Sequence, residues 1–463
     1  MRYLALSALL AWVCSLAAQM PPGEWKFDVI HRKQGVSLRG LVVDQSPTQV
    51  RIRCITRKPG SPTLVFTEVV PRDEIIRVEL ISPEERSKLE QHIDALKRER
   101  AVLGAHLRAL DPGKATSVKP LETVDLQPAT WPGDPKLRAW RYRSTYFELI
   151  AATRPELAQL AAIHLEQIYA AFARLLPPRR PEAAPTTILL TRSGADYQKL
   201  ARGRGLKLFN PAFYDSNTNQ VVCGSDLEKL CDELEAVRAH HVRLRTGIRE
   251  RRAELAKVYR GKVPAELLAP MADAEKRIDA SEMRNDASFG TVQTRLFQRL
   301  YHEAFHAYLG QFVYPQKEGP LPLWFNEGLA QIFETAIVEV GELRVGHADK
   351  ERLTSVRKAL AAGTLLPLVE VLRSEPRHFL TAHTSEQELT DRFYLAAWGL
   401  AQYLMFERRI VGTARLDEYV RALGRGVDPL LAFRDLVGKP LDAFEKEFHS
   451  YLSRLRPDGT TGK

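Results

Sequence analysis

The polar and apolar positions in the N-terminal part of the chain alternate in short runs. Between Trp25 and about Ser82, turn residues separate the segments WKFDVIHRKQG, VSLRGLVVDQSP, TQVRIRCITRKPGSP, TLVFTEVVPRD and EIIRVELISP. Apolar–polar alternation bounded by Gly, Pro, Asp and Ser is typical of β-strands that bury one face. The pattern therefore predicts a small five-stranded β-barrel domain over residues 22–82.

The pattern then becomes helical. In residues 83–110 apolar side chains recur at three- and four-residue intervals, interrupted by Arg100, at Leu89, Ile93, Leu96, Leu103, Leu107 and Leu110. This spacing predicts one helix with a coiled-coil-like seam. Residues 111–135 are rich in Pro, Gly and Thr without a sustained period, so we expect a linker there.

Residues 136–455 mix both periods and predict an α+β domain. The order is a strand-like run in RYRSTYFELIAATR, an amphipathic helix in PELAQLAAIHLEQIYAAFARLL, a short buried strand in PTTILLT, and a hairpin in NPAFYDSNTNQVVC. The chain as a whole is therefore expected to be a multi-domain α+β protein, with a disordered tail at 456–463.

A helical hairpin is predicted as an insertion at residues 226–285. Its first helix has a heptad-like repeat with His241 and Arg251 in core positions, formed by Leu227, Leu230, Leu234, Val237, Leu244, Ile248, Leu255 and Val258. A second helix is expected from about Pro264 to Met283. The hairpin is either a solvated pair of helices or, like the helix before it, a surface for a coiled-coil partner.

Charge and the N-terminal segment bear on location. The net charge is +10, but basic and acidic residues are interleaved, which indicates a solvated surface and no nucleic-acid partner; attraction to anionic envelope polymers or a membrane surface is the alternative. Arg2, an apolar run and the small residues Ala17 and Ala18 predict a signal peptide over residues 1–19. We therefore expect an exported protein that is periplasmic, envelope-associated or secreted. An uncleaved anchor is the alternative, although the apolar run is shorter than the about 20 residues that span a bilayer.

Three cysteines follow the predicted signal peptide. Cys223 and Cys231 could pair in an oxidising compartment and leave Cys54 single, or all three could be buried thiols. The sequence has no CxxC motif, so no cysteine-ligated metal is predicted.

The segment YHEAFHAYLG carries candidate chemistry. His302 and His306 are four residues apart, so on a helix both imidazoles leave the same face and can reach one metal ion. Glu303 stands beside them, where a general base could take a proton from water at the metal. An apolar stripe supports the helix, and Gly310 can end it.

A catalytic zinc also needs a third protein ligand. LPLWFNEGLAQIFE begins a helix near Pro322 and places Glu327, Gln331 and Glu334 on one face. Glu327 follows His306 by twenty-one positions, enough for a turn that sets two helices side by side. Gln331 could orient a ligand histidine, or it could be a surface amide.

These motifs resemble known families. HEAFH followed by WFNEGLAQIFE resembles the gluzincin metallopeptidases, although the gap between the second histidine and the carboxylate is longer than in gluzincin aminopeptidases and no GxMEN-like signature is present. The stretch from about 140 to 455 resembles the DUF1570 family of peptidase-MA-like proteins, since AFYDSNTNQVV, YHEAFHAYL, LPLWFNEGLAQIFE and FYLAAWGLAQYLM come in that family's order. The N-terminal barrel resembles SH3-like or Sm-like barrels by pattern alone.

The resemblance implies a zincin-like fold and a site. It makes His302, His306 and Glu327 ligands of Zn²⁺, Glu303 the general base, and Tyr394 a residue that stabilises the oxyanion. The alternative for Tyr394 is a packing residue whose hydroxyl donates to a backbone carbonyl. The implied function is hydrolysis of peptide bonds in a peptide or protein substrate, with the AFYDSNTNQVV hairpin offering an edge strand to it. The alternative function is an inactive zincin-like envelope scaffold or binding protein.

Overall fold

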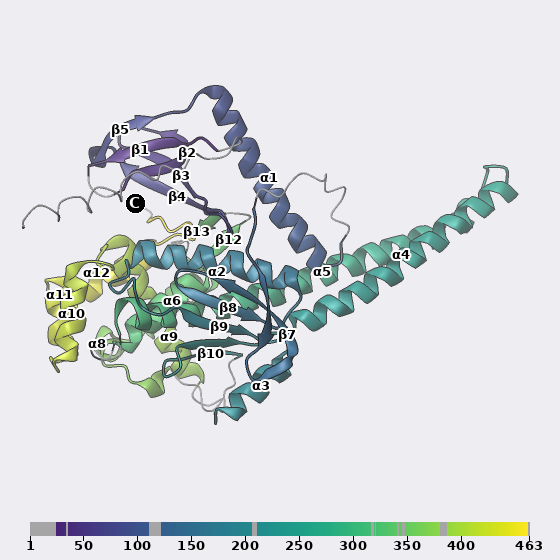
Figure 1. Cartoon of the computed structure of the whole chain (residues 1–463). Helices are drawn as coiled ribbons and strands as arrows, with labels where there is room; N and C mark the ends of the chain where they lie inside the picture. Colours follow the sequence, from purple (N-terminus) through teal and green to yellow (C-terminus); the bar gives the residue numbers. More distant parts are fainter. Residues whose placement is uncertain are drawn as a thin grey trace, which may run out of the picture. The chain divides into compact units, whose positions relative to one another are not determined.

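The first sheet along the chain is antiparallel and has five strands (Figure 1). The computed structural model describes residues 25–33, 36–110, 122–205, 211–315, 319, 321–339, 342–344, 348–379 and 387–461, and the predicted signal peptide lies outside them. The strands are β1 (Asp28–Arg32), β2 (Leu38–Gln45), β3 (Gln49–Thr56), β4 (Leu64–Pro71) and β5 (Ile75–Glu79), with the 3-10 turn η1 (Arg72–Glu74) before β5. Their order in the sheet is β4-β3-β2-β1-β5. The five strands expected from the alternating pattern are confirmed.

One face of this sheet forms a small apolar core from Ile30, Val42, Val50, Ile52, Cys54 and Val70. The carboxylate of Asp28 is fully buried beside it and accepts hydrogen bonds from the backbone N–H groups of Val42 (2.7 Å) and Ile81 (2.9 Å). Such backbone donors compensate the cost of burying a polar group. Asp28 thereby ties β1 to β2 and to the segment after β5.

The chain divides into two compact units, Met1–Cys54 with Glu68–Ala95, and Ile55–Thr67 with Leu96–Lys463. The helix α1 (Pro83–Leu107) contributes to both. Its predicted apolar seam is buried at Leu89, Ile93, Leu96 and Leu107. The interruption of that seam, Arg100, is buried in the second unit and pairs with Glu122 at 2.6 Å.

The second unit is built on a six-stranded mixed sheet. In chain order its strands are β6 (Gln127–Trp131), β7 (Asp134–Arg143), β8 (Phe147–Ala151), β9 (Thr186–Leu190), β10 (Ala212–Asp215) and β11 (Gln220–Cys223). Their order in the sheet is β10-β11-β9-β8-β7-β6, and only the pairs β8–β9 and β9–β11 are parallel among the described strands. The predicted hairpin at 212–223 is confirmed, and β10 lies at an edge.

The linker prediction is wrong at its C-terminal end, because β6 and the first residues of β7 fall within 111–135. Pro128 lacks a backbone N–H, but β6 is the other edge strand, where that donor is not needed. Gly133 has φ +85° in the turn between the two strands, a conformation that glycine adopts readily. Proline and glycine here serve a hairpin instead of a linker.

Helices cover both faces of this sheet. Ile188 and Leu190 of β9 point into the main core, which also receives α2 (Pro155–Leu175) and the C-terminal part of α5 (Ala265–Tyr308). Leu189 points the other way and packs with Tyr197 of α3 (Gly194–Gly203). The alternation along β9 therefore assigns its side chains to two cores.

The hairpin insertion has a different second helix from the one predicted. α4 (Leu227–Val258) runs antiparallel to the first part of α5, and ion pairs such as Arg252–Glu275 at 2.7 Å connect them (Figure 1). α5 does not end near Met283 but continues without a break to Tyr308. One helix thus joins the hairpin to the HEAFH segment. His241 is buried in the hairpin beside Glu282, at 3.1 Å, whereas Arg251 is exposed.

The rest of the second unit is mainly helical. Its elements are the π-helical turn η2 (Leu309–Val313), α6 (Leu323–Glu334), β12 (Ile337–Glu339) paired with β13 (Glu342–Arg344), α7 (Lys350–Ala361), α8 (Leu368–Leu372), η4 (Pro376–His378), α9 (Gln387–Gln402), η6 (Tyr403–Glu407), α10 (Ala414–Gly424), α11 (Pro429–Val437) and α12 (Leu441–Arg454). The tail predicted to be disordered forms a turn in its described part, where Leu455 bridges Thr461. No helix among the described residues has both the length and the apolar character needed to cross a membrane.

Candidate metal centre

Two packed helices bring the candidate ligands together. The apolar residues expected to support the HEAFH helix are buried at Leu296, Leu300, Phe305 and Leu309. Phe305 of α5 stacks on Phe333 of α6 with ring centroids 4.9 Å apart. With its apolar stripe fixed in the core, α5 turns His302 and His306 toward α6.

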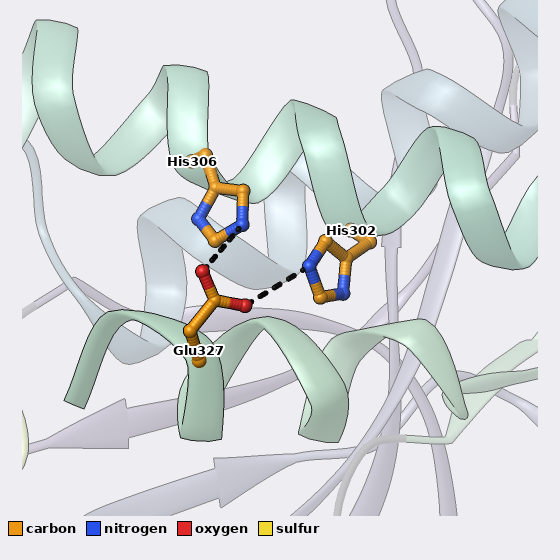
Figure 2. A group of neighbouring side chains, drawn as sticks. All are labelled: His302, His306 and Glu327. Carbon is orange, nitrogen blue, oxygen red and sulfur yellow. Dashed lines mark ion pairs between the residues drawn. The ribbon is translucent and has the colours of Figure 1, made fainter. Parts of the chain in front are cut away.

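His302, His306 and Glu327 form one cluster (Figure 2). Their candidate ligand atoms all lie within 4.8 Å of one another. The Nε2 atom of His302 is 3.3 Å from Oε2 of Glu327, and the Nε2 atom of His306 is 3.6 Å from Oε1. The predicted convergence of these three residues is confirmed, and they could hold a metal ion.

The carboxylate of Glu327 fits a bound cation. Its Oε2 atom is buried and, despite its closeness to His302, has no hydrogen bond of acceptable geometry in the described structure. A buried carboxylate oxygen without a hydrogen bond is costly unless another group compensates it. Two imidazole nitrogens and a carboxylate are also the donor set of many catalytic zinc sites.

Two further side chains orient the histidines. Nδ1 of His306 lies 2.9 Å from Oδ1 of Asn326, and Nδ1 of His302 lies 3.3 Å from Oε2 of Glu334. An acceptor at Nδ1 places the proton there and leaves the Nε2 lone pair free for a metal. Arg352 of α7 donates to the same Glu334 oxygen at 3.2 Å.

The sequence interpretation missed these orienting roles. The spacing along the sequence placed Glu334 on the correct face of its helix, and Asn326 belongs to the quoted segment WFNEGLAQIFE, but neither was assigned a function. Gln331, in contrast, is neither a surface amide nor an orienting acceptor. It is buried and donates to the backbone carbonyl of Tyr394 at 2.9 Å, which joins α6 to α9.

Charges inside the cluster shift the pKa values of His302 and Glu327. Burial alone lowers the pKa of His302, but its close contacts with the Glu327 and Glu334 carboxylates outweigh burial and raise this pKa well above its usual value. Burial raises the pKa of Glu327, whereas the charge of His306 and the close contact with His302 lower it by more, so the net shift is downward. Without a bound metal, these shifts favour a protonated His302 beside an ionised Glu327.

Gly328 follows Glu327 on α6 and lies against α9. A Cβ atom at this position would lie 2.4 Å from the carbonyl oxygen of Ala397 and 2.9 Å from Cβ of Ala401, both on α9. Contacts this short do not occur, so α6 and α9 can approach as they do only if residue 328 is glycine. This close approach positions Glu327, the neighbouring residue.

Glu303 and Tyr394 border the cluster. Glu303 is half-buried, adjacent to His302 on α5, and its charge acts on His302. The hydroxyl of Tyr394 donates to the backbone carbonyl of Phe379 at 3.1 Å, as expected if Tyr394 is a packing residue. Burial raises the pKa of Tyr394, and the charges of Glu327 and Glu303 raise it further, so this phenol is also close to the cluster.

The three cysteines are buried free thiols in this structure. Burial raises the pKa of Cys223 to about 12 and that of Cys231 to about 11. The structure therefore agrees with the alternative of three buried thiols, and Cys223 and Cys231 do not form a disulfide in it.

Comparison with known proteins gives one match. Residues 298–423 match the family model described as "Protein of unknown function (DUF1570)", a range that includes the three cluster residues and Tyr394. No curated protein and no solved structure matches the chain. The predicted resemblance to the DUF1570 family is therefore confirmed for residues 298–423, which are similar to that family.

Proposed function

We propose that this protein is a zinc-dependent hydrolase of peptide bonds. The observation that carries the proposal is the convergence of His302, His306 and Glu327, with Glu303 next to them on α5. A structural metal site would use four protein ligands, whereas a catalytic site keeps one position open. Three protein ligands and an adjacent carboxylate favour catalysis.

Zinc is the metal that we propose for this cluster. The ligands are two imidazoles and one carboxylate, each half-buried. When bound, zinc would supply a Lewis acid that polarises the scissile carbonyl and makes a nearby water more acidic. The acceptors Asn326 and Glu334 would hold a proton on Nδ1 of each imidazole and keep Nε2 turned to the metal.

The chain's own residues would then carry the proton transfers. Glu303 accepts a proton from the attacking water and returns it to the leaving nitrogen, which is the work of a general base and then a general acid. Tyr394 donates a hydrogen bond to the oxyanion as it develops. For this, the Tyr394 hydroxyl must give up its hydrogen bond to the Phe379 carbonyl and donate to the substrate oxygen instead.

The substrate and setting complete the proposal. β10 is an edge strand, and α5 packs against β10 and β11, so an extended peptide could add to this edge beside Glu303. We further propose a zincin-like fold for the second unit, an SH3-like or Sm-like barrel for the first sheet, and export to the cell envelope or beyond.

The decisive experiment compares metal content with turnover. The purified full chain should contain about one zinc ion per chain, and a His302→Ala/His306→Ala double variant should contain none. A Glu303→Gln variant should keep the zinc and lose cleavage of a mixed peptide library. Glu250→Gln, an exposed glutamate on α4, is the matched control and should behave as wild type.

The inert-scaffold alternative predicts other results. A wild-type protein that binds zinc but cleaves nothing would support the scaffold. Absence of zinc from the wild type would remove the hydrolase proposal, and cleavage unchanged by Glu303→Gln would remove Glu303 as the base.

A further inference from the structure

Arg299 lies on the same helix face as the metal cluster. It precedes His302 by three residues, Glu303 by four and His306 by seven. In an α-helix these spacings place side chains on one face, with Arg299 one turn from His302 and Glu303. Arg299 is exposed and so accessible to a ligand.

The guanidinium of Arg299 is not used by the described part of the fold. Within the described part of the chain it has no hydrogen bond or ion pair. A four-residue spacing would allow an ion pair with Glu303, yet none is formed. Arg352, in contrast, is bound to Gln331 and Glu334. Arg299 is thus a cation beside the site that leaves the proposed base free.

Arg299 also faces the edge hairpin. Burial raises the pKa of Cys223 in β11 to about 12, while the charge of Arg299 lowers it and that of Glu303 raises it. The same two charges act on Tyr197, where burial is again the largest cause of a raised pKa. Because α5 packs on β10 and β11 and both charges act on Cys223, Arg299, like Glu303, lies near the hairpin that contains the proposed edge strand.

We propose that Arg299 binds a carboxylate of the substrate close to the scissile bond, so that peptides with a carboxylate at this position are preferred. The inference rests on the proposed function. A guanidinium presents a planar fork of donors that matches a carboxylate in two parallel hydrogen bonds. The carboxylate is either an Asp or Glu side chain or the C-terminus of the peptide.

Three matched peptides separate these two sources. One contains Glu near the cleaved bond and has an amidated C-terminus, the second has Gln in that place with the same amide, and the third has Gln with a free C-terminus. A preference of about 10-fold or more in kcat/KM is expected for one carboxylate-bearing peptide over the second. Arg299→Gln should abolish this preference, and Arg299→Lys should keep part of it.

The matched control is Arg277→Gln. Arg277 is another exposed arginine of α5, about 33 Å further along the helix at 1.5 Å per residue, and its variant should keep the wild-type preference. Unchanged preference in Arg299→Gln would overturn the inference. An equal loss for all three peptides would also overturn it, because Arg299 would then act on Glu303 instead of on the substrate.

A binding measurement separates this inference from the proposed function. The full-length Glu303→Gln variant, loaded with zinc, is titrated with the three fluorescently labelled peptides, with and without Arg299→Gln. A carboxylate preference in binding that needs Arg299 would sustain the inference even if the wild type cleaves nothing. Cleavage without any carboxylate preference would leave the hydrolase and remove the role of Arg299. Absence of both binding and cleavage would reject both.

Discussion

Nδ1 of His302 lies 3.3 Å from Oε2 of Glu334, which follows the proposed ligand Glu327 by seven residues on the same face of α6. Glu334 is itself held by Arg352. A carboxylate behind a ligand histidine fixes its ring and raises its basicity. The helix that supplies the third candidate ligand therefore also orients the first.

Replacing Glu334 should weaken metal binding without removing it. For Glu334→Gln we expect zinc affinity to fall about 10–100-fold, the usual effect of losing an orienting partner. Competition with a chromophoric chelator measures this. Glu351→Gln, an exposed glutamate of α7, is the control. Wild-type affinity in Glu334→Gln would show that the contact does not orient a ligand.

Gly328→Ala should disturb the site through packing. The added Cβ would meet the Ala397 carbonyl at 2.4 Å, so α6 must shift away from α9 and take Glu327 with it. We expect a lower melting temperature and weaker zinc binding in the same variant. Gly247→Ala on α4, where a Cβ meets nothing within 4 Å, should not lower the melting temperature. Normal zinc binding in Gly328→Ala would mean that α6 adapts.

Zinc affinity should fall as the pH is lowered through neutrality. The pKa of His302 is raised in the metal-free protein, so below that pKa zinc must displace a proton from it. Each proton displaced lowers the affinity by about 10-fold per pH unit in this range. Calorimetry in buffers of different ionisation enthalpy should detect the released proton. An affinity that is constant from pH 8 to pH 6 would contradict the prediction.

Tyr394→Phe should separate catalysis from metal binding. The hydroxyl is not among the candidate ligand atoms, so zinc content should stay at the wild-type level. If the phenol stabilises the oxyanion, kcat should fall about 100-fold, the lower end of what loss of one such donor costs. Unchanged kcat would leave Tyr394 with its packing role on the Phe379 carbonyl. Tyr403→Phe, at the first residue of η6 after α9, is the control.

The buried pair of Arg100 and Glu122 should matter for stability in the second unit. Glu122 binds the guanidinium through two bonds, 2.6 and 3.0 Å long, and accepts the backbone N–H of Thr63 at 2.6 Å. Glu122→Ala leaves Arg100 buried without its partner, which typically costs about 3–5 kcal/mol. Urea unfolding followed by tryptophan fluorescence measures the change. The double variant Arg100→Met/Glu122→Leu should be less destabilised than Glu122→Ala, and the reverse order would contradict this explanation.

Several elements could be predicted because their signals are local. The alternation that defines β1 to β5 and the edge hairpin β10–β11 lies within short segments, and the His302–His306 spacing fixes its own geometry on any helix. Predictions failed where the same local sequence is compatible with two kinds of structure. Pro128 and Gly133 are typical of a linker, but both also occur in a hairpin at the edge of a sheet, and the local sequence does not distinguish the two. Nothing in residues 284–291 shows whether the two helices are separate or continuous.

The sequence by itself determined the types of side chain, their spacing along each helix and hence the face on which His302, Glu303 and His306 stand. Only the tertiary structure decided that Glu334 and Asn326 accept from those histidines, that Gln331 joins α6 to α9, and that Arg299 forms no ion pair with the part of the chain that the structure describes. The reason is physical. Periodicity fixes directions within one helix, whereas a hydrogen bond between helices depends on their relative position, which is set by packing contacts such as the one that Gly328 permits.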